Sequence, residues 1–73
     1  MDGDEVAEKF RVLMEAHRLE RGVTLAELAV KIGLSARDTG HLSRIERGLV
    51  VPSFDRAVAI AQALGISMEE FDG

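Results

Sequence analysis

Cysteine is missing from the 73 residues of the chain. Its absence excludes disulfide bonds, zinc sites with thiolate ligands and catalysis by a cysteine nucleophile. Side-chain packing alone must therefore hold the fold together. A chain of this length has room for one small core, and folding buries only about 60% of the surface that the unfolded chain exposes. We expect a single domain, residues 1–73, of modest stability that dimerisation would increase.

Long apolar runs are missing too, and none approaches the roughly 20 residues that a membrane-spanning helix needs. Hydrophobic residues make up 47% of the chain and charged residues 30%, a balance typical of a globular protein. The chain starts with an acidic stretch, MDGDE, that no uninterrupted apolar stretch follows, so we expect no secretory signal. The default expectation is a soluble, cytoplasmic protein without a membrane partner.

Histidine is scarce, and the two present, His17 and His41, are far apart in the sequence. Neither lies in a His-Glu-x-x-His arrangement, and the chain has no glycine-rich phosphate loop and no nucleophile elbow. No spacing of side chains suggests metal ligands. We therefore expect no enzymatic activity, no cofactor, no metal and no small-molecule ligand.

The formal net charge of −4 argues against strong non-specific attraction to phosphate. The charges are unevenly distributed, however, because seven of the 13 acidic residues lie towards the two ends, with an acidic tail at about 1–5. Between Lys31 and Arg47, four basic residues stand against two acidic ones: Lys31, Arg37, Arg44 and Arg47 against Asp38 and Glu46. The sequence predicts a small basic patch in this segment.

Apolar residues recur at helical spacing, and no stretch shows the alternation of a strand. The first stretch, around Val6–His17, predicts a helix that Gly22 ends, since glycine tolerates the left-handed conformation after a helix C-terminus. Thr24 opens a second helix that runs to about Ile32. Thr24 and Glu27 form a capping box, in which each side chain satisfies a backbone N–H.

Two further helices are predicted in the last third of the chain. Ser53 caps a helix whose apolar residues recur until Gly65. Ser67 and Glu70 form another capping box, which opens a short last helix. Together with a third helix that ends at Gly48, the sequence predicts an all-α, compact five-helix bundle.

The start of the third helix has two interpretations. Ser35 and Asp38 form a box that would begin the helix at Ser35, although Gly40 would then lie inside it at a cost of about 1 kcal/mol. Asp38 can instead cap a shorter helix after a longer turn. The box favours the longer helix. Leu42 and Ile45 give the helix its inward face in either case.

Three strings stand in order along the chain: GVTLAELAVKIGLS, LSRIERG and PSFDRAVAIAQALGISMEEF. Over residues 10–71 they resemble the Cro and repressor-like (XRE) family of helix-turn-helix DNA-binding domains. The resemblance implies a bundle of the lambda-repressor-like type, in which the second and third helices, about residues 24–47, form the DNA-reading unit and the third enters the major groove. It also implies a homodimer that binds two half-sites of double-stranded DNA.

The chain departs from the family at the third helix. Seven positions lead from Ser35 to Leu42, where similar proteins have four. The sequence therefore contains a three-residue insertion within Ala36–Gly40, around the turn or the start of the third helix.

The outward residues of the third helix are short polar or cationic groups suited to base edges and phosphates. We expect Arg44 to read bases, since arginine can bond guanine O6 and N7 together, and Arg47 to contact phosphate. Thr24, first of all a cap, is expected to reach phosphate too. The expected DNA-binding residues are Thr24, Ser35, Arg37, Thr39, His41, Ser43, Arg44 and Arg47.

Glu46 is an acid placed among basic residues of the DNA-reading helix. In similar proteins this glutamate pairs with an arginine of the first helix, and Arg18 occupies the matching place. The resemblance therefore implies a structural ion pair between Arg18 and Glu46.

Three neighbouring apolar residues, Leu49–Val51, form a loop where similar proteins often carry lysine or arginine. Such a loop indicates either core burial or a protein interface. The residues expected at a dimer interface are Leu49, Val50, Val51, Met68 and Phe71. In the alternative interpretation, Met68 and Phe71 simply cover the small core.

These observations predict a sequence-specific, double-stranded DNA-binding regulator of transcription, a repressor that acts as a homodimer. The alternative is a protein-interaction module on the same fold, such as an antitoxin, an antirepressor or a subunit of a transcription complex. The acidic balance, the insertion and the apolar loop favour the alternative, whereas Arg37, Arg44 and Arg47 around the third helix favour DNA.

Overall fold

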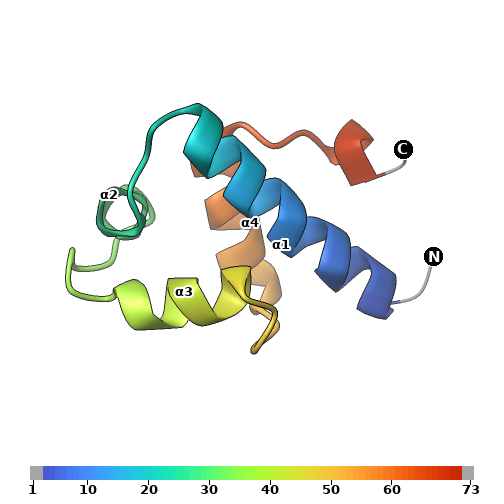
Figure 1. Ribbon diagram of the computed structural model, residues 1–73, viewed down its shortest axis with the longest axis horizontal. Coiled ribbons are helices and arrows are strands. Elements are labelled where there is room, and N and C mark those ends of the chain that lie inside the picture. Colours follow the sequence, from blue (N-terminus) through green and yellow to red (C-terminus); the bar gives the residue numbers. More distant parts are fainter. Residues whose placement is uncertain (1–2, 72–73) are drawn as a thin grey trace.

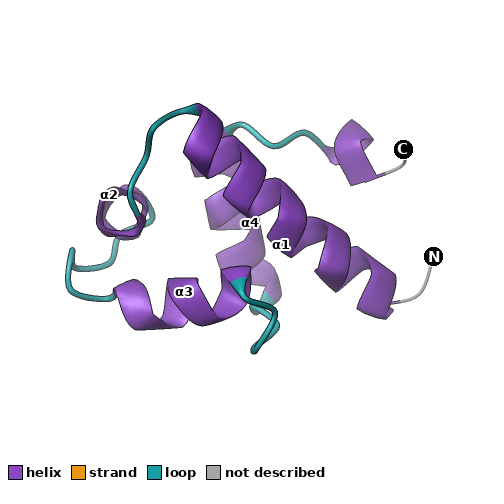
Figure 2. Ribbon diagram, viewed as in Figure 1, coloured by secondary structure: helices purple, strands orange, loops and turns teal. Residues whose placement is uncertain are grey.

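Four α-helices and one 3-10 helix follow one another along residues 3–71, the part of the chain that this computed structural model describes. Figure 2 shows helices joined by loops, with no strand among the described residues. The all-helical prediction is therefore confirmed. In chain order the elements are α1 (Gly3–Glu20), α2 (Leu25–Lys31), α3 (Thr39–Glu46), α4 (Phe54–Leu64) and η1 (Met68–Phe71).

The helix boundaries follow local capping chemistry. The Thr24 hydroxyl accepts a hydrogen bond from the Glu27 N–H at 3.0 Å, and the Thr24 N–H donates to the Glu27 carboxylate at 3.3 Å, so the predicted capping box of α2 is confirmed. Ser53 caps α4 by accepting from the Arg56 N–H. The glycines predicted to end helices, Gly22, Gly48 and Gly65, have positive φ angles, and so does Gly33 after α2; such angles favour glycine over residues with a side chain.

Two predictions about the ends of the bundle were wrong. Residues Gly3–Glu5 of the expected acidic tail belong to α1, whose first turn gains from acidic side chains because they face the positive end of the helix dipole. Residues 1–2 of that tail lie outside the described residues. The fifth helix is a short 3-10 helix, η1, rather than an α-helix. The Ser67 N–H donates to the Glu70 carboxylate at 2.7 Å, so the glutamate half of the predicted box is present there.

The prediction of a longer third helix that starts at Ser35 was also wrong, because α3 begins at Thr39. Ser35 and Asp38 do interact, but they close a turn: the Ser35 N–H donates to Asp38 Oδ2 at 3.1 Å, and the Asp38 N–H donates to the Ser35 carbonyl at 2.9 Å. Asp38 has a non-helical backbone (φ −86°, ψ 49°) and makes no side-chain bond to α3. Its carboxylate reaches back to the turn, so it precedes α3 without capping it, and Gly40 lies in the first turn of the helix.

The core lies where α1 crosses α3 and α4, with α2 packed against α3 and α4 (Figure 1). Each α-helix contributes the apolar stripe that its periodicity predicts. Among residues 3–71, nine hydrophobic residues are buried: Phe10, Met14, Leu28, Ala29, Leu42, Ile45, Ile60, Leu64 and Ile66. None of the helices described here is long and apolar enough to cross a membrane.

The short helix η1 packs against α1. The ring of Phe71 stacks on that of Phe10 with centroids 6.4 Å apart, and Lys9 Nζ donates to the Phe71 carbonyl at 3.1 Å. His17 lies between two partners. Arg21 can only donate hydrogen bonds, so His17 Nδ1 accepts one from Arg21 Nη1 at 2.9 Å. His17 Nε2 therefore carries the ring proton and donates it to Glu70 Oε1 at 2.5 Å.

The Glu70 carboxylate should make the stability of the protein depend on pH. Its hydrogen bonds with the Ser67 N–H and with His17 lower the pKa of Glu70 below its ordinary value of 4.5. A lowered pKa contributes stability that is present above about pH 4.5 and is lost as the pH falls through the folded-state value. We expect Glu70→Gln to destabilise the protein at neutral pH, and the difference from wild type to shrink below pH 4.5. Urea unfolding between pH 3 and 7 measures it; a difference that stays constant with pH would contradict this role.

Candidate nucleic-acid interface

Helix α3 has one face in the core and the other in solvent. Leu42 is fully buried and Ile45 is 1% exposed, so the inward face predicted for this helix is confirmed. In Figure 1, α3 forms the lower edge of the bundle, with α1 and α4 above it. The side chains of α3 that point away from the core are therefore available to a partner.

The outward side of α3 carries polar and cationic groups. His41 and Arg44 on the helix, and Arg47 just after it, are exposed, while Thr39 and Ser43 are half-buried. Arg47 folds back along the helix, with its Nε donating to the Ser43 carbonyl at 3.4 Å. These groups can donate hydrogen bonds to base edges or phosphate oxygens.

Arg18 and Glu46 fix the C-terminal end of α3 to α1. Arg18 Nε donates to Glu46 Oε2 at 2.9 Å and Nη2 donates to Oε1 at 3.1 Å, which makes the pair bidentate. A third bond runs from Arg18 Nη1 to the Val23 carbonyl at 3.0 Å. The side chain of Glu46 is only 5% exposed and that of Arg18 16%. The pair therefore ties α1, the start of the α2 segment and the end of α3 together.

This pairing also shapes the charge of the exposed face. The segment from Lys31 to Arg47 contains two acidic residues, but Glu46 is buried and neutralised by Arg18. Asp38 is left as the one exposed acid in the segment. The four cations of the segment, Lys31, Arg37, Arg44 and Arg47, are all exposed. The exposed side chains between Lys31 and Arg47 are therefore cationic on balance although the whole chain is acidic.

The connection between α2 and α3 comprises seven residues, 32–38, which is longer than the three or four of a common helix-turn-helix turn. The Ser35 hydroxyl accepts from the Arg37 N–H at 3.2 Å, so the turn is held by Ser35 on one side and Asp38 on the other. Ser35 and Arg37 are both exposed. The turn thus places an arginine in solvent just before the exposed face of α3 begins.

Thr24 is exposed at the N-terminus of α2, but its hydroxyl is already occupied. It accepts from the Glu27 N–H and donates to Glu27 Oε1 at 3.1 Å. A phosphate would have to displace the second of these bonds. The structure therefore shows Thr24 first as a helix cap.

The structure separates the residues expected at a dimer interface. Leu49 and Val51 are 62% and 75% exposed, whereas Val50 between them packs against the core. Phe71 is half-buried against Phe10, while Met68 on η1 is exposed. In Figure 1 the loop after α3 and η1 lie on opposite sides of α1, so the two groups do not form one surface.

Phe54 is a surface residue that the sequence pattern did not reveal. It begins α4 and is 81% exposed. With Leu49 and Val51 it gives the loop between α3 and α4 a run of apolar groups in solvent; we call these three residues the apolar loop patch. The sequence did hold a signal for this exposure, because Phe54 stands directly after the Ser53 cap and before the first residue of α4 that faces the core.

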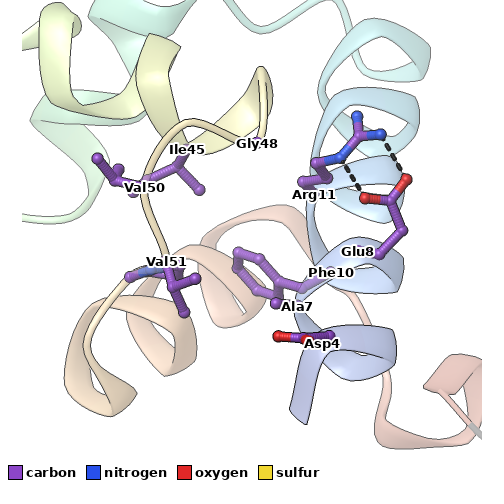
Figure 3. A pocket seen from close by; sticks show the side chains of 10 residues that line it. Asp4, Ala7, Glu8, Phe10, Arg11, Ile45, Gly48, Val50 and Val51 are labelled. Carbon is purple, nitrogen blue, oxygen red and sulfur yellow. Dashed lines mark hydrogen bonds and ion pairs between the residues drawn. The ribbon is translucent and has the colours of Figure 1, made fainter. Parts of the chain in front are cut away.

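A hollow of about 180 Å³ lies beside this loop, between the N-terminal half of α1 and the residues that follow α3 (Figure 3). Phe10, Ile45 and Val50 give it apolar walls, and Asp4 lies at its edge. Across the hollow, Arg11 is paired with Glu8 and lies over Gly48. In the part of the chain that the structure describes, no group of acidic residues and histidines could hold a metal ion.

The arrangement of α2 and α3 is that of a helix-turn-helix unit: Figure 1 views α2 end-on and α3 from the side, and α3 presents a polar, cationic face to solvent. A family model described as helix-turn-helix matches residues 14–71. The chain therefore belongs to this family of DNA-binding transcription regulators, which is generally non-enzymatic. No curated protein and no solved structure matches the chain.

Breaking the ion pair between Arg18 and Glu46 should destabilise the protein. Glu46→Gln leaves the Arg18 guanidinium half-buried without its anion, and we expect a loss of about 3 kcal/mol in the free energy of unfolding. Glu8→Gln is the matched control, because it breaks an exposed ion pair with Arg11 and should change stability little. Urea unfolding of both variants makes the comparison, and equal effects would show that Arg18 and Glu46 do not anchor α3.

Proposed function

We propose that the protein is a sequence-specific, double-stranded DNA-binding regulator of transcription that acts as a homodimer and represses by occupying a promoter. Each copy inserts α3 into the major groove. The observation that carries the proposal is the exposed face of α3, where cations and small polar groups stand over a fully buried inner face. Because the inner face of α3 packs in the core, its outer face is left for contact with base edges.

The residues of this face have different parts in the proposal. Arg44 reads a base, since guanidinium groups bond guanine O6 and N7 as a bidentate pair. Arg37 in the turn and Arg47 after α3 flank it and contact phosphates, which positions the helix without reading sequence. Thr39, His41, Ser35 and Ser43 supply further polar contacts, and Thr24 adds its hydroxyl where a phosphate displaces Glu27.

The distribution of charge supports binding in one orientation. The exposed acids Asp4, Glu5 and Glu8 lie in the first turns of α1, at the right of Figure 1, whereas the α2–α3 turn lies at the left. The start of α1 is therefore anionic, whereas the exposed side chains between Lys31 and Arg47 are cationic on balance. The anionic start of α1 disfavours contact with phosphate, so the net charge of −4 limits non-specific binding while these cations remain attractive.

The apolar loop patch supports the dimer. Leu49, Val51 and Phe54 are exposed next to the C-terminal end of α3. A two-fold contact uses the same surface on both copies. In the proposed dimer this patch joins the two copies, and the two α3 helices bind two successive major grooves.

One observation favours a second candidate function, a protein-interaction module. The apolar loop patch and the adjoining hollow of about 180 Å³ could instead receive an apolar side chain of a different protein. In that case α3 would not need to read DNA. Selection of DNA sequences by the folded protein separates the two functions.

The function is tested by selecting binding sites from a randomised pool of duplex DNA near physiological salt. We expect a palindrome whose half-sites are centred one helical turn, about 34 Å, apart, because a two-fold dimer places its two reading helices at that spacing. Enrichment of a single half-site would support DNA reading without the dimer. No enrichment from a sample that unfolds cooperatively would overturn the proposal in favour of the protein-interaction module.

Arg44→Ala should remove the base preference at one position of each half-site and weaken binding to the selected duplex roughly 10-fold or more, since one bidentate contact is worth about 1–3 kcal/mol. The side chain is exposed, so thermal unfolding should be almost unchanged. Arg21→Ala is the control, because it removes an exposed arginine that directly follows α1 and does not belong to α3. A selection profile that Arg44→Ala leaves unchanged would show that Arg44 does not read bases.

A further inference from the structure

Gly40 is an unusual residue on the exposed face of α3. It lies in the first turn of α3, and it is exposed. Glycine weakens a helix because it loses more backbone freedom on folding than any other residue. Its presence in an eight-residue helix therefore needs a reason.

The fold itself supplies no such reason. Gly22, Gly33, Gly48 and Gly65 all have positive φ angles, at which a side chain would be strained. Gly40 has none of this strain, because its φ angle lies outside that region. A Cβ built on Gly40 would meet a single neighbour, Arg44 Nη1, at 3.4 Å, which is an ordinary contact. Alanine would thus fit the free protein and strengthen α3.

The surroundings of Gly40 suggest that the missing side chain serves a partner. Arg44 lies one turn further along the same side of α3, and its guanidinium extends over the bare backbone at Gly40. Apart from this group, the space over Gly40 is open to solvent. Another surface can therefore approach the helix backbone closely at this point, directly beside the arginine.

We propose that Gly40 is a specificity-determining position of the DNA interface, at which the backbone of α3 packs directly against the DNA beside the Arg44 guanidinium. The inference rests on the proposed function. A side chain at this position holds the helix further from the groove and moves the guanidinium away from the base edge that it reads. Gly40 thereby sets the depth at which α3 enters the groove.

The test compares Gly40→Ala and Gly40→Leu with the wild-type protein. Both replacements favour helix more than glycine does, so thermal unfolding should occur at the same or a higher temperature, by about 4 °C for alanine. Binding to the duplex selected by the wild type, measured by fluorescence anisotropy, should fall about 10-fold for Gly40→Ala and further for Gly40→Leu. Gln62→Ala, at an exposed position of α4, controls for helix stabilisation away from α3 and should bind as the wild type does.

The outcomes are distinguishable from those for the proposed function. Loss of affinity that grows with side-chain size, in variants at least as stable as the wild type, supports the role of Gly40. Variants that bind the selected duplex as tightly as the wild type overturn this inference and leave DNA binding intact. A wild-type protein that selects no DNA sequence overturns the proposed function and this inference together.

Discussion

The position of α3 depends on one buried ion pair. Arg18 and Glu46 form two hydrogen bonds across the interface of α1 and α3, and the third bond of Arg18, to the Val23 carbonyl, fixes the chain between α1 and α2. Hydrophobic contacts are not directional and would tolerate small rotations of a short helix. A bidentate guanidinium–carboxylate pair is directional, and it fixes the rotation of α3 about its own axis. The exposed side chains of α3 take their directions from that rotation.

The same ion pair resolves a conflict between composition and surface. An acidic chain is a poor partner for a polyanion, and an acid on the reading helix would worsen the repulsion. Placing Glu46 in the interior uses its charge for anchoring and removes it from the exposed face. Three exposed acids, Asp4, Glu5 and Glu8, lie in the first turns of α1, away from the turn between α2 and α3 (Figure 1). For an anionic partner, the distribution of charge matters more than its total.

Local chemistry allowed most of the fold to be predicted from the sequence. The helix ends at Thr24, Ser53 and the C-terminal glycines follow from hydrogen bonds and φ angles within a few residues. The start of α3 did not follow, because the Ser35–Asp38 pair closes a turn with the same bonds that could open a helix. The division of the expected dimer surface did not follow either, since the half-burial of Phe71 depends on its contact with Phe10 in a distant segment of the chain. On α3 and just after it, helical spacing predicted the exposure of His41, Arg44 and Arg47, whereas the half-burial of Thr39 and Ser43 did not follow from it.

Among the helices described, η1 packs against α1 alone, although Phe71 also reaches the edge of the core. Its contacts join residues as far apart in sequence as Lys9 and Phe71, and they can form only after α1 is in place. The core between α1, α3 and α4 does not include η1 itself. We therefore expect η1 to be released in a local opening that leaves the bundle folded, so that amide hydrogens of residues 68–71 exchange with solvent without global unfolding.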